Sequence, residues 1–309
     1  MSDSVLEFVE VRKSFGHVHA LRDVTFAVQR SETVALLGPN GAGKSTAISL
    51  LLGLRSADHG IVRIEDRDPR VAGLRGSIGA MLQETALPPG LKVRELVEFY
   101  RSIYPKPWSF AEVVERANLA DILERRVERL SGGQRRRLAF ALAIAGNPRI
   151  LFLDEPTAGM DAGARLAFWQ QIDHLASAGR TVLFTTHYLE EADVHSRRVL
   201  LLHKGRLLAE GRPEELRRRS GGRTIRFSTP PEWAARLAGM FAGQTVVREG
   251  GMVRIHASAD GENSAEAVIR RLVHGEVPMR DLEVTTPSLE TALRQLEEEA
   301  SDDAVASVD

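Results

Sequence analysis

The chain has 309 residues, which suggests about two domains, and its 43% hydrophobic content is ordinary for a soluble protein that buries a substantial core. The formal net charge is -1, so no overall field would attract nucleic acid or an anionic membrane. The absence of cysteine excludes disulfide bonds, thiolate metal sites and cysteine nucleophiles, and it fits a reducing cytoplasm.

The sequence predicts neither a signal peptide nor a membrane-spanning segment. Residues 1–8 lack the basic and apolar stretches of a signal peptide, so we expect none. The longest uncharged apolar run, residues 139–145, is far shorter than the ~20 residues that cross a bilayer. Any membrane role is therefore expected to go through a partner, with no direct insertion.

The first part of the chain has the pattern of an α/β core. Short strands are expected at residues 6–11, 24–28 and 60–64. Residues 34–37 form a continuous apolar run that ends at a glycine-rich loop, which is typical of a buried parallel strand. An amphipathic helix is expected to follow at residues 44–54.

The middle of the chain changes to helical spacing. We expect a small helical subdomain at about residues 88–146, broken into pieces by the prolines at 88, 89, 105 and 107. Two more buried strands, residues 150–153 and 181–184, flank a helix at residues 162–178. The segments 199–202 and 206–209 predict a hairpin around Lys204 and Gly205.

A second domain is expected after residue 219. A charged helix at residues 213–219 and a hinge at Ser220, Gly221 and Gly222 precede it. Its expected strands are 224–228, 245–248, 252–257 and 282–285, and its expected helices are 231–241 and 265–273. This order predicts a small α+β domain of the ferredoxin-like kind at residues 220–300. It ends in a helix at residues 289–300, and residues 301–309 are expected to be a disordered tail.

A phosphate-binding loop follows the strand at residues 34–37. Residues 38–45 fit the pattern G-x-x-x-x-G-K-[S/T], with a strand before and a helix after. The glycines let the backbone N–H groups face inward as an anion nest, and the helix adds its positive dipole end. Lys44 would neutralise the β- and γ-phosphates, and Ser45 would ligate Mg²⁺. The nucleotide-binding residues are Gly38, Pro39, Asn40, Gly41, Ala42, Gly43, Lys44, Ser45 and Thr46.

Two carboxylates follow the predicted strand at residues 150–153, at the usual ligand position of an open α/β sheet. Asp154 would hold Mg²⁺ through water, because this ion prefers few protein ligands. Glu155 would activate or orient the attacking water. A structural acidic turn is the alternative, and the nearby phosphate loop favours the metal and catalytic roles.

A second glycine turn, residues 130–134, opens the helix expected at residues 135–145 and could grip a phosphate from the opposite side. Ser131 is a good N-cap, which is the plain structural interpretation. The turn lies between the phosphate loop and the two carboxylates. Its residues Ser131, Gly132, Gly133 and Gln134 match a five-residue signature that is highly specific to one superfamily of ATPases. The chain resembles the ATP-binding subunit of an ATP-binding cassette (ABC) transporter over about residues 5–215. The resemblance implies an α/β P-loop NTPase fold with an inserted helical subdomain, spanning residues 1–219.

Other positions gain roles from this resemblance. It implies that Phe15 stacks on adenine, that Gln83 senses Mg²⁺ and water as a ligand and catalytic residue, and that His187 contacts the γ-phosphate. Asp161 matches the loop that joins two halves of a dimer. Taken alone, these residues would be interpreted as a core phenylalanine, a polar loop residue, a structural histidine and a helix N-cap.

The resemblance also implies that Ser131 and Gly133 meet the γ-phosphate held by a second protomer. One phosphate loop and one signature occur in the chain, so a pair of complete sites needs two cassettes. A homodimer around two ATP molecules is expected. Met160 and residues 195–198 depart from the family pattern without touching the catalytic residues, so we expect an active ATPase.

Residues 285–290 resemble the Thr-Pro-Ser-Leu-Glu tail of ATPase subunits from bacterial drug, lipid and polysaccharide exporters. This implies a membrane-spanning permease as partner and a peripheral position at the cytoplasmic face of the membrane.

Two alternatives remain. The first is a cassette ATPase that acts on nucleic acid or ribosomes, which the short, proline-interrupted interval and the single cassette disfavour. The second is a non-hydrolysing ATP-dependent regulator, which Glu155 and His187 disfavour.

Overall fold

The computed structural model describes residues 4–71, 76–83, 87–219, 222–241, 246–249, 252–258, 261–285 and 288–306. The chain divides into two compact units, Met1–Glu210 and Gly211–Asp309. The sequence-based boundary lies nine residues later, after residue 219. The difference is helix α7 (Pro213–Arg219), which packs against α10 (Leu289–Ala306) and so belongs with the second unit.

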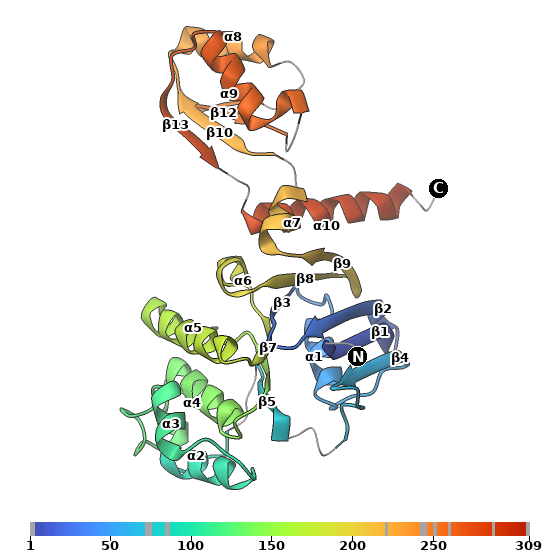
Figure 1. Ribbon diagram of the computed structural model, residues 1–309, viewed down its shortest axis with the longest axis vertical. Coiled ribbons are helices and arrows are strands. Elements are labelled where there is room, and N and C mark those ends of the chain that lie inside the picture. Colours follow the sequence, from blue (N-terminus) through green and yellow to red (C-terminus); the bar gives the residue numbers. More distant parts are fainter. Residues whose placement is uncertain are drawn as a thin grey trace. The chain divides into compact units, whose positions relative to one another are not determined.

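A small antiparallel sheet opens the first unit (Figure 1). Its strands are β1 (Ser4–Phe15), β2 (Val18–Gln29) and β4 (His59–Ile64), in the order β2-β1-β4. β1 and β2 are longer than expected, because their pairing continues to a tight turn at Gly16, where φ is 58°. Phe8 and Phe26 are paired across the strands, and their ring centroids stack 4.6 Å apart in the core.

The main sheet carries the parallel strands β5 (Ile78–Met81), β6 (Ile150–Asp154), β7 (Thr181–Thr185), β3 (Thr33–Leu37) and β8 (Arg198–His203), in that order, and β9 (Arg206–Gly211) completes it beside β8. All residues of β3, β6 and β7 are buried, which explains their continuous apolar sequence. The carboxyl ends of the parallel strands meet at one edge, here called the carboxyl edge, and their amino ends meet at the opposite amino edge. Loops at the carboxyl edge are the usual ligand sites of such sheets.

Two elements of this unit were not expected from the sequence, namely β5 and α6 (Leu189–His195). β5 has only four residues and includes a glycine, and α6 has only seven residues, so neither has a clear period. Helix α1 (Lys44–Leu51) is three residues shorter than expected, and it ends before Gly53, where φ is 65°. Helix α5 (Ala162–Ser177) agrees with expectation to within one residue.

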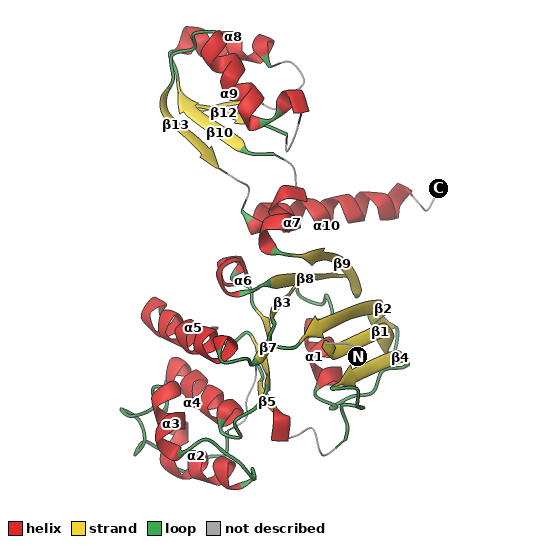
Figure 2. Ribbon diagram, viewed as in Figure 1, coloured by secondary structure: helices red, strands yellow, loops and turns green. Residues whose placement is uncertain are grey.

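The helical subdomain contains α2 (Val93–Ser102), α3 (Phe110–Arg116) and α4 (Gly132–Ile144), which pack against one another. A short 3-10 turn, Val127–Arg129, precedes α4. Figure 2 shows only helices and loops in this part of the unit. The prolines at 105 and 107 lie between α2 and α3, as predicted. Helix α4 begins three residues earlier than expected, because the signature turn itself forms its first turn.

The second unit is a four-stranded antiparallel sheet with helices on one face (Figure 2). The strands are β10 (Thr224–Ser228), β11 (Val246–Glu249), β12 (Met252–His256) and β13 (Arg280–Thr285), in the order β11-β12-β10-β13. The helices are α8 (Pro231–Met240) and α9 (Ala265–His274), with a 3-10 turn at Gly261–Asn263. Phe227, Ile255 and Leu272 are core residues. This is the strand order of a split β-α-β motif.

The end of the chain differs from the sequence-based expectation. Helix α10 runs to Ala306, so residues 301–306 are helical where a disordered tail was expected. Residues 307–309 lie outside the described residues, as do Ser220 and Gly221 of the expected hinge, and residues 286 and 287 of the segment that resembles exporter tails.

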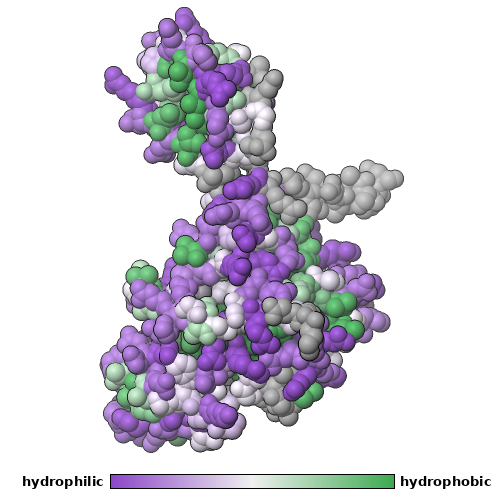
Figure 3. Space-filling model, viewed as in Figure 1, coloured by the Kyte–Doolittle hydropathy of each residue, from purple (hydrophilic) through white to green (hydrophobic). Residues whose placement is uncertain are grey.

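Within the described part of the chain, no helix is both long enough and apolar enough to span a bilayer. On the face of the first unit seen in Figure 3, most side chains are hydrophilic and the hydrophobic ones are scattered.

Candidate functional site

The phosphate loop lies at the carboxyl edge, between β3 and α1, and neighbouring strands enclose it. At Gly38, where φ is 145°, an added Cβ would lie 2.1 Å from the carbonyl oxygen of Leu202 in β8. At Gly43, where φ is 108°, it would lie 2.5 Å from the carbonyl oxygen of Ala20 in β2. Both positions therefore require glycine for the fold itself as well as for phosphate binding.

Lys44 is 7% exposed, and its side chain extends toward the backbone of this loop. Its Nζ donates to the carbonyl oxygens of Gly38 at 2.6 Å and Pro39 at 3.1 Å. The ammonium group is thus held at the mouth of the backbone nest, where it can meet phosphate oxygens.

Asp154 is the last residue of β6, so it lies within the strand rather than beyond it as expected. The extension to Asp154 follows from its pairing with Thr185 in the β6–β7 ladder. Its Oδ1 accepts a hydrogen bond from Thr185 Oγ1 at 2.5 Å, and its Oδ2 lies 3.5 Å from Ser45 Oγ. The phosphate loop hydroxyl and the strand-end carboxylate therefore face each other.

Glu155 is the centre of a cluster of polar side chains. Its Oε2 accepts from Gln83 Nε2 at 3.0 Å, and its Oε1 lies 2.5 Å from His187 Nε2. Its backbone N–H donates to Thr185 Oγ1 at 3.0 Å. Its φ is 48°, the left-handed region that few residues other than glycine adopt. The loops after β5, β6 and β7 thus bring together three residues that lie far apart in the sequence.

A buried carboxylate in α6 joins two of these loops. Glu191 is 5% exposed, and it accepts hydrogen bonds of 2.6 Å from Thr157 Oγ1 and from Thr186 Oγ1. Arg165 Nε of α5 lies 3.6 Å from the same carboxylate. The loop after Glu155 is thereby fixed to the loop that carries His187. The sequence interpretation missed Glu191 and Thr185, because α6 was not expected and a threonine at a strand end has no distinct signal.

Phe15 ends β1 and is 39% exposed, so it is not a core phenylalanine. Two cations lie beside its ring, with Arg55 Cζ 4.8 Å and Lys13 Nζ 5.5 Å from the centroid. An exposed ring of this kind offers a flat apolar surface to a base.

The signature turn is the N-terminus of α4, and it forms a capping box. Gln134 N donates to Ser131 Oγ at 3.3 Å, and Ser131 N donates to Gln134 Oε1 at 3.0 Å. A Cβ added at Gly132 or Gly133 would meet no atom of the described part of the chain within 4 Å. Glycine in a helix costs about 0.5–1 kcal/mol relative to alanine, and no steric contact with the residues that the structure describes requires it here. The backbone of this turn is open to an approaching molecule.

The signature turn lines a cavity together with the start of α5. A cavity of 630 Å³ is lined by Ser131 and Gly133 together with Asp161 at the start of α5. Asp161 caps that helix, accepting from Ala164 N at 2.8 Å. Residues 38–46, all of them described, are absent from its lining. Ser131 and Asp161 thus share a cavity that the phosphate loop of the same chain does not line.

A direct hydrogen bond connects the signature helix to the segment that carries Gln83. Arg136 NH1 of α4 donates to the carbonyl oxygen of Leu82 at 3.2 Å. A cavity of 200 Å³ lies beside this contact and is lined by Gln83, Leu87 and Gly132. Movement of α4 would therefore act on the Gln83 segment.

The oxygen atoms at the carboxyl edge are suitable ligands for Mg²⁺. Among the described residues there is no group of three or more His, Cys, Asp or Glu side chains that could hold a metal alone. Ser45 and Asp154 offer hard oxygen atoms, and the carbonyl oxygen of Gln83 is a third candidate because its Nε2 is bonded to Glu155. Few protein ligands suit Mg²⁺, which takes its other ligands from water and phosphate.

Comparison with known proteins gives consistent results. The family model described as ABC transporter matches residues 21–158. Nod factor export ATP-binding protein I of Bradyrhizobium diazoefficiens is 40% identical over 229 residues, which are 70% of this chain and 73% of that protein. Doxorubicin resistance ATP-binding protein DrrA of Mycobacterium tuberculosis is 38% identical over 224 residues, 68% of this chain and 66% of that protein.

Solved structures resemble about two thirds of the chain. The ATP-binding subunit of an ABC transporter has a TM-score of 0.64 and 27% identity, covering 70% of this chain and 93% of that one. The cassette MJ0796, solved as a dimer in a post-hydrolysis state with ADP and Pi, has a TM-score of 0.62 and 28% identity, covering 67% of this chain and 98% of that one.

Proposed function

Because this chain belongs to the ABC transporter family and is an ATP-binding ATPase of that type, we propose that it powers export through a separate membrane-spanning permease subunit. The names of relatives that act in Nod factor export and doxorubicin resistance support this direction of transport. The chain would lie at the cytoplasmic face of the membrane, held there by the permease. Acting on nucleic acid or ribosomes is not favoured, since these relatives are exporter components.

The observation that carries the catalytic part is the cluster around Glu155. In the proposed reaction, Glu155 takes a proton from the water that attacks the γ-phosphate. Gln83 and His187, which both contact its carboxylate, would orient that water and the γ-phosphate. Lys44 and the loop N–H groups would neutralise phosphate charge, and Phe15 would stack on the adenine.

We propose that Ser45, Asp154 and Gln83 hold Mg²⁺, the last two through water or directly. The ion, when bound, supplies charge neutralisation at the phosphate oxygens. Thr185 fixes the carboxylate of Asp154 by a hydrogen bond, so this side chain needs little rearrangement to serve as a ligand.

The proposed active form is a dimer of two identical chains around two ATP molecules. The open backbone at Gly132 and Gly133, and the separate cavity that Ser131 shares with Asp161, support this assembly. Each chain would bind ATP with its own phosphate loop and cover the ATP of its partner with its signature turn. The Arg136–Leu82 hydrogen bond would pass closure to the segment of Gln83 and so to the permease.

Substitution of the proposed base tests the reaction. Glu155→Gln should keep ATP binding, lower turnover by about 10²–10⁴-fold and accumulate an ATP-dependent dimer. Phosphate release and size-exclusion chromatography measure the two effects. Glu190→Gln, an exposed acid in α6, is the matched control and should behave as the unmodified protein. Normal turnover by the Glu155 variant would remove this residue from the mechanism.

Cross-linking tests the assembly. The chain has no cysteine, so Asn40→Cys and Ser131→Cys introduce unique thiols into the Glu155→Gln background. With Mg-ATP, a disulfide should form between two chains that carry one cysteine each. Cross-links confined to single chains in the double-cysteine protein would contradict the proposal. A permease that copurifies with the tagged chain would establish the export partner.

A further inference from the structure

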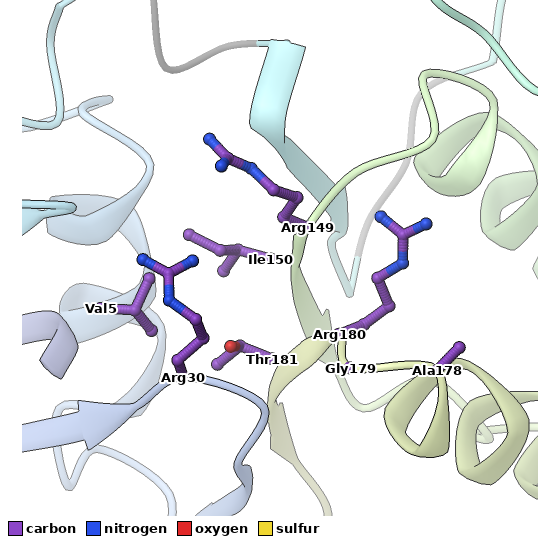
Figure 4. A pocket seen from close by; sticks show the side chains of 8 residues that line it. All are labelled: Val5, Arg30, Arg149, Ile150, Ala178, Gly179, Arg180 and Thr181. Atoms are coloured by element: carbon purple, nitrogen blue, oxygen red, sulfur yellow. The ribbon is translucent and has the colours of Figure 1, made fainter. Parts of the chain in front are cut away.

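The amino edge of the main sheet, opposite the catalytic residues, carries a second charged site. A pocket of 230 Å³ lies there, lined by Arg30, Arg149 and Arg180 and by the starts of β6 and β7 (Figure 4). The three arginines come from separate segments, directly after β2, before β6 and before β7. Figure 4 shows all three side chains extending toward the top of the view, with Arg30 and Arg149 to the left of the central strands and Arg180 to the right. The fold therefore brings together three guanidinium groups that lie far apart in the sequence.

The pocket has an excess of positive charge. Its lining residues are all described, and none is acidic. One carboxylate lies close by, because Glu65 Oε2 accepts from Arg149 NH2 at 2.9 Å and Glu65 Oε1 lies 3.6 Å from Arg30 NH1. The carboxyl end of α5 reaches the pocket at Ala178 and adds a partial negative charge of about one half. Three positive charges thus face less than two negative ones.

Most of the N–H groups in the pocket are not used by the described part of the chain. A guanidinium has five donors. Arg30 makes no hydrogen bond to a described residue, and Arg149 uses only NH2, toward Glu65 and toward Ser77 Oγ at 3.2 Å. Arg180 differs, because NH1 donates to Pro148 O at 2.8 Å and NH2 to Asn147 Oδ1 at 2.7 Å. One arginine is fixed by the fold, and two have free donors.

Repulsion among the arginine charges also favours an anion in the pocket. Burial lowers the pKa of Arg180, and the neighbouring charges of Arg116 and Arg149 lower it further. An anion in the pocket would oppose each of these effects. If the three arginines served only to fix the turns around them, Arg30 would be expected to bond to one of those turns.

We propose that this pocket binds a small oxyanion of the phosphate class, either free phosphate or the phosphoryl group of a lipid headgroup. Guanidinium groups match the geometry and charge of phosphate oxygens. The volume is below the ~300–1,000 Å³ of pockets for drug-sized ligands, so a whole nucleotide is not the expected occupant. The anion would sit at the amino ends of β6 and β7, the strands whose other ends carry Asp154 and Thr185.

Binding of inorganic phosphate tests the free-ion form. The nucleotide site is first saturated with Mg²⁺ and a non-hydrolysable ATP analogue, so that the phosphate loop cannot bind the probe. Phosphate should then bind saturably, as measured by ³¹P line broadening and by the melting temperature of the full chain. Arg30→Gln and Arg149→Gln should each weaken this binding about tenfold, the loss of one charge-assisted contact.

Vesicles of phosphatidylcholine with phosphatidylglycerol test the headgroup form by co-sedimentation with the same variants. Arg63→Gln is the matched control for both probes, because this exposed arginine of β4 lies outside the pocket. Arg30 makes no hydrogen bond to a described residue and its side chain is half exposed beside Glu65, so its variant should change the melting temperature without ligand only slightly. The proposal is overturned if neither probe binds, or if the two pocket variants bind as well as the control.

Discussion

The two glycine turns of the first unit open helices in the same way, yet the chain surrounds them differently. The phosphate loop is enclosed, since side chains at Gly38 or Gly43 would collide with the carbonyl oxygens of Leu202 and Ala20. The signature turn is open, since side chains at Gly132 or Gly133 would meet no atom of the described residues within 4 Å. Glycine at the first turn is required by the described chain, whereas the described chain leaves room for a side chain at the second.

The two turns therefore allow the effect of a substitution on stability to be distinguished from its effect on activity. A residue can be needed because the fold cannot form without it, or because a bound molecule must approach it. The first reason holds for the phosphate loop, and under the proposed assembly the second reason applies to both turns. Substitutions at the two turns should therefore have distinct consequences.

The largest expected effect on stability is at the enclosed turn. Gly38→Ala places a Cβ about 2.1 Å from a backbone oxygen at a φ of 145°, so the loop or β8 must move. We expect a loss of about 3 kcal/mol or more in the free energy of unfolding, measured in urea. A change below about 1 kcal/mol would mean that the loop is not enclosed as described.

The open turn should lose activity and keep stability. Gly133→Ala is expected to leave the free energy of unfolding unchanged or to raise it by up to about 1 kcal/mol, because alanine favours a helix. ATPase activity should fall at least about tenfold, because the added methyl group occupies the surface that approaches ATP. A variant that is both less stable and fully active would contradict the comparison.

Mixing experiments are the control for the Gly133→Ala prediction. Alone, Lys44→Ala chains should be inactive, and Gly133→Ala chains should keep at most about a tenth of the ATPase activity. In a mixed dimer, the intact phosphate loop of one chain meets the intact signature of the other, so ATP hydrolysis should partly return. Without recovery on mixing, the two turns would have to act within one chain.

A smaller effect is expected from the buried carboxylate on the phosphate-loop side. Glu191→Gln keeps the size of the side chain and removes the charge that faces Arg165 and two threonine hydroxyls. We expect kcat to fall about three- to tenfold with KM unchanged, because His187 is held less firmly. Its contacts lie on the phosphate-loop side of its own chain, so a mixed dimer with Gly133→Ala has one site free of both substitutions, and ATP hydrolysis should partly return, as for Lys44→Ala. An equal fall for exposed Glu190→Gln would exclude a specific role.

The smallest effect concerns the helix that carries the signature turn. Arg137 of α4 donates to Asp121, and this hydrogen bond lowers the pKa of the carboxyl below its ordinary value. The folded pKa is depressed, so the contribution is present above the unfolded pKa of about 3.9 and is lost as pH falls through the folded value. Both side chains reach solvent, which limits it to below about 1 kcal/mol. Asp121→Asn should therefore reduce, by that amount, the fall in the free energy of unfolding that urea denaturation measures between neutral and acid pH.

Much of the first unit could be predicted from sequence, because its strands are continuous apolar runs and its phosphate loop has a fixed spacing. β3, β6 and β7 were expected within one residue of their bounds at either end. β5 and α6 were missed, since four- and seven-residue elements have no readable period. The length of the β1–β2 hairpin was underestimated, because strand pairing extends elements beyond their apolar centres.

The site shows the same limit. Spacing alone identified Lys44, Ser45, Asp154 and Glu155, and the family resemblance added Gln83 and His187, which the structure brings onto one carboxylate. Their roles in catalysis remain predictions. No sequence pattern could show that Glu191 is buried between two loops, because this depends on how α5 and α6 pack. Nor could it distinguish a glycine that the fold needs from one that it leaves exposed.

The backbone at Glu155 has a consequence for selection in the laboratory. A left-handed conformation costs a non-glycine residue about 1–2 kcal/mol, and glycine or asparagine would relieve much of it. Variant libraries screened only for heat tolerance should therefore enrich Glu155→Gly or Glu155→Asn. These variants would have a higher melting temperature and no ATPase activity. Screens that alternate heating with an ATPase assay should instead retain glutamate and collect their gains elsewhere.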